Sequence, residues 1–456
     1  MNIIILGAGK VGTAFAEHFA KENNNITVVD QNVTHLTPLS EHLDIRTIVG
    51  HASYPNILKL AGADEADLLI AVTNSDETNM VACQIAHSIF QTPRKIARVR
   101  QVQYSAHKRL FQSSDIPIDI LISPGSLVTE EIRQSIVHPD AENVLEFGNK
   151  ALQLVTIKAK IGGLLIQKQI KNLEEFISAD SCKVVALYRD KKATEITDES
   201  YIYPGDEIYF LSKNQFTDKS ISLFRPLSKK PKRIILVGGG NIGTSLATSL
   251  EQRFHVKVIE KDAKVIEHLA TTLQKAIVLH GDAVDQSLLT HENVMNTDVF
   301  CAVTNSDETN MVACMLAKNL GARKTIAIIN NEVYYEIIGS HVDVLISPQS
   351  STISSLLSHI RRGDVTQVHS LKFGDAEAME VIAHGSKANS FAIGKPMAHL
   401  ELPCGATLGA IIRVDEIYMQ QSDIIIQEGD HMIFFLQDKR ALPKLESLFN
   451  PIPIPV

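Results

Sequence analysis

The feature that most constrains this chain is a stretch of thirteen residues that occurs in it twice without change. AVTNSDETNMVAC fills positions 71–83 and again positions 302–314. A helix or strand that only has to bury an apolar face can do so with many residue combinations, so packing alone does not demand an identical polar run in two places. The repeat therefore indicates either a function for these residues or a very recent duplication.

Similarity between the two halves extends well beyond this stretch. Short motifs recur in the same order in both: IIILGAGKVG at 3–12 and IILVGGGNIG at 234–243, ITVVD at 26–30 and VKVIE at 256–260, IDILISP at 118–124 and VDVLISP at 342–348. Further on, residues 184–211 match residues 408–435. These matches predict a tandem duplication of a unit that has two parts.

The first part of each unit alternates apolar runs of strand length with segments of helical period, such as the spacing of Val81, Ile85 and Ile89. Nearly continuous apolar strands are typical of a parallel sheet that is covered on both faces. The predicted fold class is therefore α/β, with two Rossmann-like, doubly wound parallel-sheet domains. The expected strands of the first copy are Asn2–Leu6, Ile26–Asp30, Arg46–Val49, Asp67–Val72, Ile96–Val99 and Asp119–Ile122.

The second part of each unit has short strand patterns with turn signals and little helix, which predicts a small α+β domain. We expect parallel-sheet domains at 1–124 and 232–348, and smaller domains at 143–227 and 368–453. Residues 214–233, which contain several Lys, Ser and Pro residues, are expected to link the two units.

Composition excludes several classes of protein. The chain is mildly acidic, with 44 Lys and Arg against 52 Asp and Glu, so a nucleic-acid-binding surface is not expected. No secretory leader follows Met1 and no long apolar run occurs, which predicts a soluble, cytoplasmic protein without membrane insertion. The five cysteines include no Cys-x-x-Cys pair, which argues against a disulfide framework or zinc site. We expect Cys83 and Cys314 to serve packing.

A glycine-rich turn carries the first chemical signal. Gly7-Ala8-Gly9-Lys10-Val11-Gly12 follows an expected strand and opens a helix, and Asp30 ends the next strand. Glycines at these positions permit a tight turn and close approach of a pyrophosphate, which the helix N-terminus attracts. The pattern recurs as Gly238-Gly239-Gly240-Asn241-Ile242-Gly243 with Glu260. Two nucleotide sites are therefore predicted.

The acidic residue at the end of the second strand is suited to bind ribose hydroxyls, and it disfavours a 2′-phosphate. NAD(H) is accordingly expected in preference to NADP(H). ATP and ADP carry the same ribose, so the motif does not separate them from NAD(H).

The repeated stretch follows the fourth strand, and its polar residues are expected at the carboxyl edge of the sheet, where such folds bind ligands. Thr73 and Asn74 are placed to reach the nucleotide, and Asn74 with Glu77 has capping-box spacing. The alternative is that the polar run only caps the helix. Because a cap needs one or two of these residues, we favour ligand contact together with capping.

Together these motifs closely resemble the TrkA family, the peripheral regulatory subunits of bacterial Trk-type potassium uptake systems. The resemblance covers essentially the whole chain and depends on GAGKVG, the acidic end of the second strand, AVTNSDETNM and the duplicated layout. Each unit resembles an RCK (KTN) N-terminal domain followed by an RCK-C (TrkA-C) domain. The resemblance implies that nucleotide occupancy reshapes a ring of these domains, which pulls on the pore of a membrane potassium-channel or transporter subunit.

The resemblance further implies a homo-oligomer, most simply a tetramer, held at the inner face of the cell membrane through its pore partner. The residues that it implies as nucleotide contacts are Gly7, Ala8, Gly9, Lys10, Val11, Asp30, Thr73, Asn74 and Arg98 in the first copy, and Gly238, Gly239, Gly240, Asn241, Ile242, Glu260, Thr304 and Asn305 in the second.

The chain departs from the family pattern at two places. Family members often have Gly-Asp-Ala after the third strand, where the first copy has His51 in place of the acid and the second has Asp282. Arg98 aligns with Ile328, so the second copy lacks this cation. We therefore expect the first site to distinguish ATP from ADP and the second to hold triphosphates weakly.

An NAD-dependent oxidoreductase is the main alternative, but it needs a second domain that presents an acid or base to substrate. Neither small domain shows a catalytic constellation, and His51 and His280 are read as polar rim residues. A redox-sensing transcription factor would need a basic DNA-reading element, which we do not find. Lys10 lies inside the glycine motif rather than after it, so a Walker A ATPase is not expected. The prediction is a binding protein without enzymatic activity.

Overall fold

The computed structural model describes residues 1–449 except for short segments at 21–23, 106, 112–114, 191, 332, 339–340, 361–364, 372–375, 386–389, 391, 415, 420–422 and 439–440. The chain divides into two compact units. Residues 1–127 and 348–356 form the first unit, and residues 128–347 with those from 357 onward form the second.

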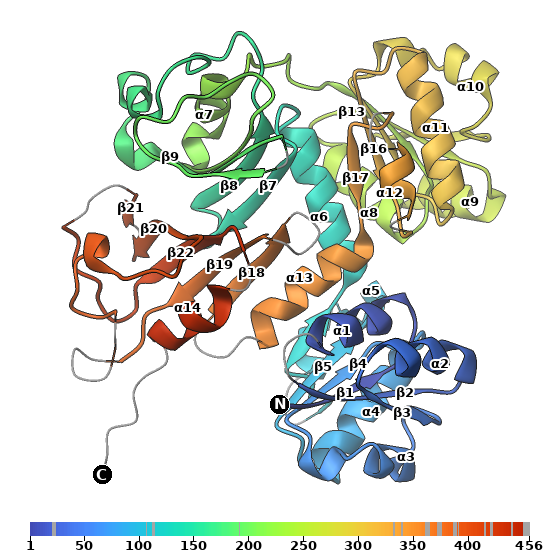
Figure 1. The fold of residues 1–456 in the computed structure, drawn as a ribbon. Coiled ribbons are helices and arrows are strands. Elements are labelled where there is room, and N and C mark those ends of the chain that lie inside the picture. The colour runs from blue at the N-terminus through green and yellow to red at the C-terminus, as the bar shows by residue number, and fades with distance from the viewer. Residues whose placement is uncertain are drawn as a thin grey trace. The chain divides into compact units, whose positions relative to one another are not determined.

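The first unit contains a parallel sheet with strand order β3-β2-β1-β4-β5-β6. Every neighbouring pair in this sheet runs parallel, and helices cover both of its faces (Figure 1). The predicted α/β class is confirmed for this copy. Its main elements are β1 (Asn2–Leu6), α1 (Lys10–Ala20), β2 (Asn25–Asp30), α2 (Val33–His42), β3 (Arg46–Val49), α3 (Pro55–Leu60), β4 (Leu68–Ala71), α4 (Asp76–Ser88), β5 (Arg94–Arg98), α5 (Val102–Ser105) and β6 (Ile120–Ile122).

The second unit repeats this sheet with the order β14-β13-β12-β15-β16-β17, which confirms the predicted duplication of the parallel-sheet part. Its elements are β12 (Arg233–Val237), α8 (Asn241–Leu250), β13 (His255–Glu260), α9 (Ala263–Thr272), β14 (Ile277–His280), α10 (Gln286–His291), β15 (Val299–Ala302), α11 (Asp307–Asn319), β16 (Lys324–Ile328), α12 (Val333–Ile338) and β17 (Val344–Ile346).

Alternation of side chains along each strand places a core on both faces of the sheet. In β12, Ile234 and Leu236 pack into a cluster with α8 and α9, while Ile235 and Val237 pack into a second cluster with α11. Both sets are almost completely buried, which explains why the strand is apolar at every position after Arg233.

Helix α4 forms where expected, but it buries a different face from the one that its large apolar residues suggest. Val81 and Ile89 are 47% and 57% exposed, whereas Ala82, Cys83 and Ala86 are fully buried against the sheet. Small side chains let the helix lie close to the strands, so they occupy the contact face. Burial raises the pKa of the Cys83 thiol to about 12, in keeping with a packing role.

Each small domain is built on a five-stranded sheet, with orders β10-β9-β11-β8-β7 and β18-β19-β22-β20-β21. The strand pairs in both sheets are antiparallel. Their elements are β7 (Asn143–Phe147), β8 (Leu152–Lys158), β9 (Cys182–Arg189), β10 (Lys192–Thr194), β11 (Glu207–Lys213) and α7 (Thr217–Phe224), then β18 (Val365–Leu371), β19 (Ala376–Ile382), β20 (Ala406–Arg413), β21 (Glu416–Tyr418), β22 (His431–Leu436) and α14 (Leu442–Phe449).

The two antiparallel sheets pack against each other within the second unit. Leu154 and Leu211 of one sheet share a buried cluster with Ile433 and Phe435 of the other. The ammonium group of Lys183 also donates to the main-chain carbonyls of residues 408 and 419, at 3.0 and 2.9 Å. Because α7 occupies residues 217–224, the expectation that 214–233 is entirely a linker is wrong, and the irregular connection is limited to 225–232.

A long helix follows each parallel sheet and associates with the other copy. Helix α6 (Pro124–Val137) buries Val128, Ile132 and Ile136 in the core of the second sheet. The first nine residues of α13 (Pro348–Ile360), up to Leu356, belong to the compact unit of the first sheet. Neither exchange is evident from the order of elements along the sequence.

Candidate functional site

The glycine turn of each copy has the backbone conformation that the sequence predicts. Gly7 has φ +102° and Gly238 has φ +99°, in the region that favours glycine. A Cβ on Gly7 would lie 3.0 Å from the N and Cα atoms of Thr73. The turn therefore lies directly against the start of the repeated stretch, as expected for a shared site at the carboxyl ends of the strands.

The next positions leave the backbone open to a ligand. Ala8 is buried, but a Cβ on Gly9 or on Gly240 would meet no atom within 4 Å. Lys10 and Asn241, which begin α1 and α8, are exposed beside these glycines. An exposed glycine at the start of a helix of ten or more residues presents unpaired N–H groups to phosphate. Val11 and Ile242, one residue further along, are half-buried.

The acidic residue of each copy supports the glycine turn. Asp30 accepts the backbone N–H of Ala8 at 2.7 Å, and Glu260 accepts the backbone N–H of Gly239 at 2.6 Å. The second carboxylate oxygen accepts N–H groups of the residues that follow, such as Asn32 at 2.8 Å. A carboxylate has about four acceptor sites, so each can hold the turn and still accept a ribose hydroxyl.

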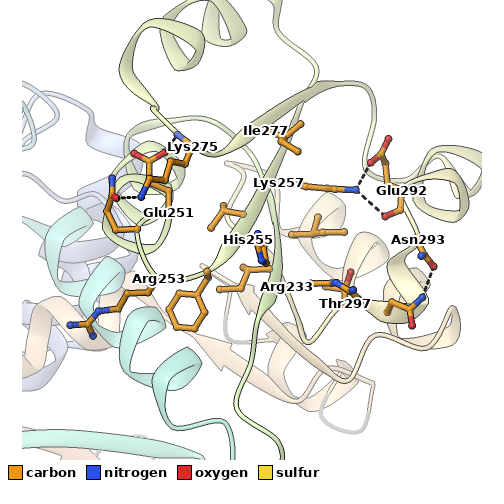
Figure 2. Close-up of a pocket in the computed structure, with 16 residues that line it drawn as sticks. Arg233, Glu251, Arg253, His255, Lys257, Lys275, Ile277, Glu292, Asn293 and Thr297 are labelled. Carbon is orange, nitrogen blue, oxygen red and sulfur yellow. Dashed lines mark hydrogen bonds and ion pairs between the residues drawn. The ribbon is translucent and has the colours of Figure 1, made fainter.

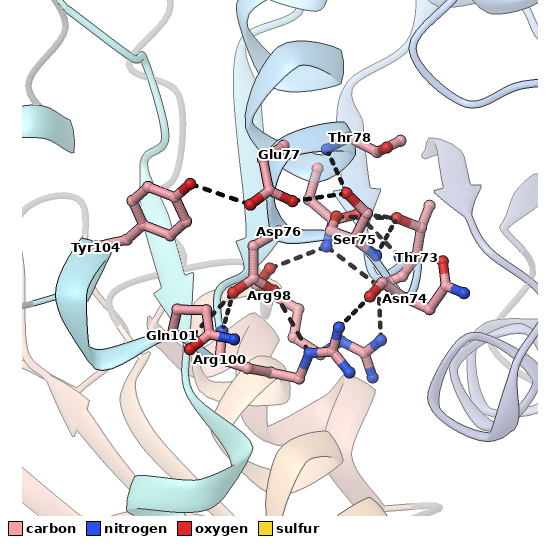
Figure 3. A network of polar contacts seen from close by, with 11 residues as sticks. Thr73, Asn74, Ser75, Asp76, Glu77, Thr78, Arg98, Arg100, Gln101 and Tyr104 are labelled. Atoms are coloured by element: carbon pink, nitrogen blue, oxygen red, sulfur yellow. Dashed lines mark hydrogen bonds and ion pairs between the residues drawn. The ribbon is translucent and has the colours of Figure 1, made fainter. Parts of the chain in front are cut away.

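The polar run after β4 is a helix cap, although the capping residue differs from the predicted one. Ser75, rather than Asn74, is the N-cap of α4: its hydroxyl accepts the N–H of Thr78 at 3.1 Å and donates to Glu77 at 2.9 Å (Figure 3). The side chain of Asn74 is exposed. Capping therefore accounts for Ser75 and Glu77 but not for Asn74.

Asn79, which the sequence did not single out, organises this loop. It is completely buried, and its side-chain oxygen accepts from the N–H and hydroxyl of Thr73 at 2.9 and 2.7 Å. Its amide nitrogen donates to the carbonyls of Thr73 and Arg98, at 3.3 and 2.9 Å. The side chain thus uses every hydrogen-bonding site to join the ends of β4 and β5. The sequence signal that could have identified Asn79 is its place inside the repeated stretch.

Arginine side chains close the same loop from the neighbouring strand. Arg98 donates from Nη2 to the carbonyl of Thr73 at 2.6 Å, and its buried Nε has no hydrogen-bond partner. Burial lowers the pKa of the Arg98 guanidinium to about 10, with the nearby Arg100 acting in the same direction. Arg100 contacts the carbonyl of Asn74, while buried Asp76 accepts the backbone N–H of Arg100 and Gln101 at 2.8 and 2.9 Å. Figure 3 shows this network.

The second copy keeps the same framework without the arginines. Asn310 accepts from the N–H and hydroxyl of Thr304 at 2.9 and 2.6 Å, and it donates to the carbonyls of Thr304 and Ile328 at 3.0 and 2.9 Å. Asp307 accepts the N–H groups of the residues after β16. Asn305, like its counterpart Asn74, is exposed. The two sites therefore share their backbone support and differ in charge.

His51 lies at the carboxyl edge of the first sheet, and its side chain contacts nearby residues of the same turn. Its Nδ1 lies 2.9 Å from the hydroxyl of Ser53, and its ring stacks on Tyr54 with centroids 4.6 Å apart. Asp282, at the same place in the second copy, accepts the N–H of Val284 at 3.1 Å. Each side chain thus shapes the turn after the third strand.

The described residues contain neither a candidate membrane span nor a candidate metal cluster. No helix in the described part of the chain is both long and apolar enough to cross a membrane. Among the same residues, no three His, Cys, Asp or Glu side chains gather in a way that would hold a metal ion.

Known proteins with similar sequences match the chain from end to end. The TrkA-N domain model matches residues 3–124 and 234–348. A Trk system potassium uptake protein TrkA from Halomonas elongata is 45% identical over 451 residues, which cover 99% of both chains. Another, from Vibrio alginolyticus, is 43% identical over 455 residues, again with 99% of both chains covered.

Solved structures share the fold at low sequence identity. The GsuK RCK domain superposes with a TM-score of 0.61 at 16% identity, covering 98% of this chain and 94% of that one. The GsuK channel bound to NAD gives a TM-score of 0.59 at 17% identity, covering 98% of this chain and 78% of that one. The sequence matches decide the family: the chain belongs to the Trk system potassium uptake protein TrkA family.

Proposed function

We propose that this protein is the nucleotide-sensing regulatory subunit of a Trk-type potassium uptake system. Its relatives across the whole length carry that system's name, and both parallel sheets carry an open glycine turn beside an acidic residue. Ligand-dependent change in a ring of these domains would act on the pore of a membrane subunit. The protein itself would lie in the cytoplasm, at the inner face of the membrane through that subunit.

The observation that carries the proposal is the contact between the glycine turn and the repeated stretch. Gly7 lies against the backbone of Thr73, and Gly238 lies against that of Thr304. A nucleotide seated on the turn would therefore touch the loop that Asn79 or Asn310 ties to the next strand. NAD(H), ATP and ADP all have the ribose and phosphates that such a site recognises. A structural neighbour of the same fold is a channel bound to NAD.

We propose binding without catalysis. An oxidoreductase needs a group that exchanges protons with substrate beside the nicotinamide, and His51, the nearest candidate, is occupied by its stacking on Tyr54 and its contact with Ser53. The family relationship also gives no support to the oxidoreductase alternative. NADH incubated with a panel of carbonyl compounds should be oxidised no faster than in buffer. Substrate-dependent oxidation that His51→Ala abolishes would establish the enzyme instead.

The two sites are proposed to differ in their response to phosphate charge. The first has Lys10 and Arg98, where the second has Asn241 and Ile328. A hydrogen bond to a charged group contributes roughly 1.5–3 kcal/mol, which corresponds to an affinity difference of about ten- to a hundredfold. We therefore assign discrimination of ATP from ADP to the first site, and NAD(H) binding with weak triphosphate affinity to the second.

Calorimetric titration of the full-length protein tests this assignment. Arg98→Ala should weaken ATP binding at the first site by about tenfold or more, while Ile328→Ala serves as the matched change in the second copy and should have little effect. Glu260→Ala should weaken NADH binding at the second site. If Arg98→Ala leaves ATP affinity unchanged while Glu260→Ala abolishes it, the roles of the two copies are the reverse of those proposed.

We also propose a tetramer in which each chain contributes four domains, 1–124, 143–227, 232–348 and 368–453. Val81 on α4 and Ile89, which caps the carboxyl end of this helix, are exposed, and Val312 is exposed on the corresponding helix α11. Such residues are typical of surfaces that are covered in an assembly. Light scattering on the purified protein should give four times the mass of the chain, and Val81→Asp with Val312→Asp should reduce it. A stable monomer at micromolar concentration would contradict the proposal.

A further inference from the structure

A cavity of about 550 Å³ opens at the amino ends of the strands of the second parallel sheet (Figure 2). Arg233, His255 and Ile277, which line it, are the first residues of β12, β13 and β14. The glycine turn follows the carboxyl end of β12, so the full strand of five residues, roughly 17 Å, separates the two places. This cavity is therefore distinct from the nucleotide site.

Positive charge predominates in the lining. Arg233, Arg253, Lys257 and Lys275 face two carboxylates, those of Glu251 and Glu292. Both acids are already engaged. The Glu292 carboxylate pairs with the Lys257 ammonium at 2.7 Å, and one oxygen of the Glu251 carboxylate accepts the N–H groups of residues 274, 275 and 276 at 2.8–3.0 Å.

Neither arginine forms an ion pair with a carboxylate of the lining, and the Asp298 carboxylate, whose pKa Arg233 helps to lower, pairs with Arg323 at 3.2 Å. Over the described part of the chain, neither the Arg233 nor the Arg253 guanidinium takes part in a hydrogen bond or ion pair, and the same is true of the His255 imidazole. Guanidinium groups bind phosphate through paired, parallel hydrogen bonds. An anion is therefore the ligand that these groups lack.

The first copy shows that this charge is not a requirement of the fold. Strand register pairs Arg233 with His255, where the first copy pairs Asn2 with Asn25. The two asparagines hydrogen-bond each other at 3.0 Å. Neighbouring strands are only about 4.8 Å apart, so the Arg233 guanidinium and the His255 imidazole are close enough to bind the same ligand.

We propose that the cavity binds a phosphate-bearing small molecule, with Arg233 and Arg253 holding the phosphate. Apolar surface for the rest of the ligand is present on the same rim, where Phe254 is half-buried and the Ile277 side chain is 54% exposed. The volume is in the range of small-molecule sites. The site depends on Arg233 and His255, where the first copy has Asn2 and Asn25, and it adds a regulatory input at the end of the sheet opposite the nucleotide.

Calorimetry with pyrophosphate on the full-length protein tests the proposal. Titrations are run on the wild type and on Gly9→Asp/Gly240→Asp, which places a carboxylate in each open glycine turn and repels phosphate there. Binding that persists in this variant is expected to weaken at least tenfold, about 1.4 kcal/mol, when Arg233→Asn/His255→Asn is added, which restores the first-copy pair. Arg253→Gln should weaken it as well. Lys219→Asn, an equal change in charge at an exposed position of α7, should leave it unchanged.

Vesicles that contain phosphatidic acid form the second arm, because a lipid headgroup carries the same phosphate chemistry. Sedimentation with vesicles that the Arg233→Asn/His255→Asn variant loses would assign the phosphate to a lipid, and soluble binding alone would assign it to a metabolite. Two results would overturn the proposal. One is pyrophosphate binding that Gly9→Asp/Gly240→Asp abolishes, since all binding would then belong to the glycine turns. The other is binding that both pocket variants retain at full strength while the fold, monitored by circular dichroism, is unchanged.

Discussion

Replacement of Asn79 by leucine should be strongly destabilising, because the side chain is fully buried and makes four hydrogen bonds. Leucine has a similar size but no polar atom. After the change, the hydroxyl of Thr73 can still donate to the carbonyl of Ser75, and the carbonyl of Thr73 can still accept from Arg98. The backbone N–H of Thr73 and the carbonyl of Arg98 lose the Asn79 amide as their partner.

Two partly buried backbone groups thus lose a hydrogen bond. Each unsatisfied group costs roughly 1–3 kcal/mol, which gives about 2–6 kcal/mol for the pair. For a domain of this size, 1 kcal/mol shifts the melting temperature by about 4 °C, so we expect a decrease of roughly 8 °C or more. Asn79→Asp should be at least as harmful, because a carboxylate would face the two carbonyl oxygens to which the amide now donates.

Differential scanning calorimetry of the full-length protein measures this effect. Gln84→Leu is the matched control, since it removes an amide from the same helix whose bond to Ser88 lies at the surface. That control should change stability by no more than about 0.5 kcal/mol. A melting temperature within about 3 °C of the wild type for Asn79→Leu, combined with a tenfold loss of nucleotide affinity, would refute the structural role and make Asn79 a ligand contact.

Two further predictions concern buried charges. Lys324 donates to the carbonyls of Ser135, Pro139 and Ala141 at 3.0–3.4 Å, and burial lowers its pKa to about 8. As the pH rises, the folded protein should therefore release this proton before the unfolded chain does. Its free energy of unfolding, relative to that of Lys324→Met, should then increase above about pH 8 by on the order of 1 kcal/mol per pH unit. Urea unfolding at about pH 7 and 10 measures this difference. Arg189→Met should cost about 1–3 kcal/mol in calorimetry, because it removes both 2.8 Å bonds to buried Asp206, which keeps the N–H of Tyr203. Unchanged stability would show that this pair is dispensable.

The parallel sheets were predictable because their strands have mostly apolar central positions and the first strand of each copy is followed by a glycine turn. The expected place of the site at the carboxyl edge follows from that fold class. The buried face of α4 was not predictable from apolar spacing, because the contact is made by Ala82, Cys83 and Ala86 rather than by the larger Val81 and Ile89. Periodicity identifies a helix, but close packing decides which side faces the sheet.

The sequence also did not predict that the helix after each parallel sheet packs with the other copy. Nothing in the local pattern distinguishes an α6 that covers its own sheet from one that buries Ile132 in the core of the second sheet. The contact of α6 with the second sheet depends on residues that are far apart in the sequence and meet only in the folded chain. Pro139 has no N–H to bond the carbonyl of Ser135 four residues earlier, and Lys324 of the second sheet donates to that carbonyl instead. The helix end is therefore satisfied by the other copy.

The two thirteen-residue stretches are identical although their neighbours have diverged. The hydrogen bonds of Asn79 and Asn310 offer a reason for this difference. Asn79 donates to the carbonyl of Arg98, and Asn310 donates to the carbonyl of Ile328. Both contacts reach a backbone atom, so the side chain at that position is free to change from a cation to an apolar residue without disturbing the loop. Within the stretch, by contrast, Asn79 bonds the hydroxyl of Thr73 as well as its backbone, so neither residue can change alone. A fixed framework with variable side chains around it would allow one fold to carry the two proposed nucleotide sites with different charge.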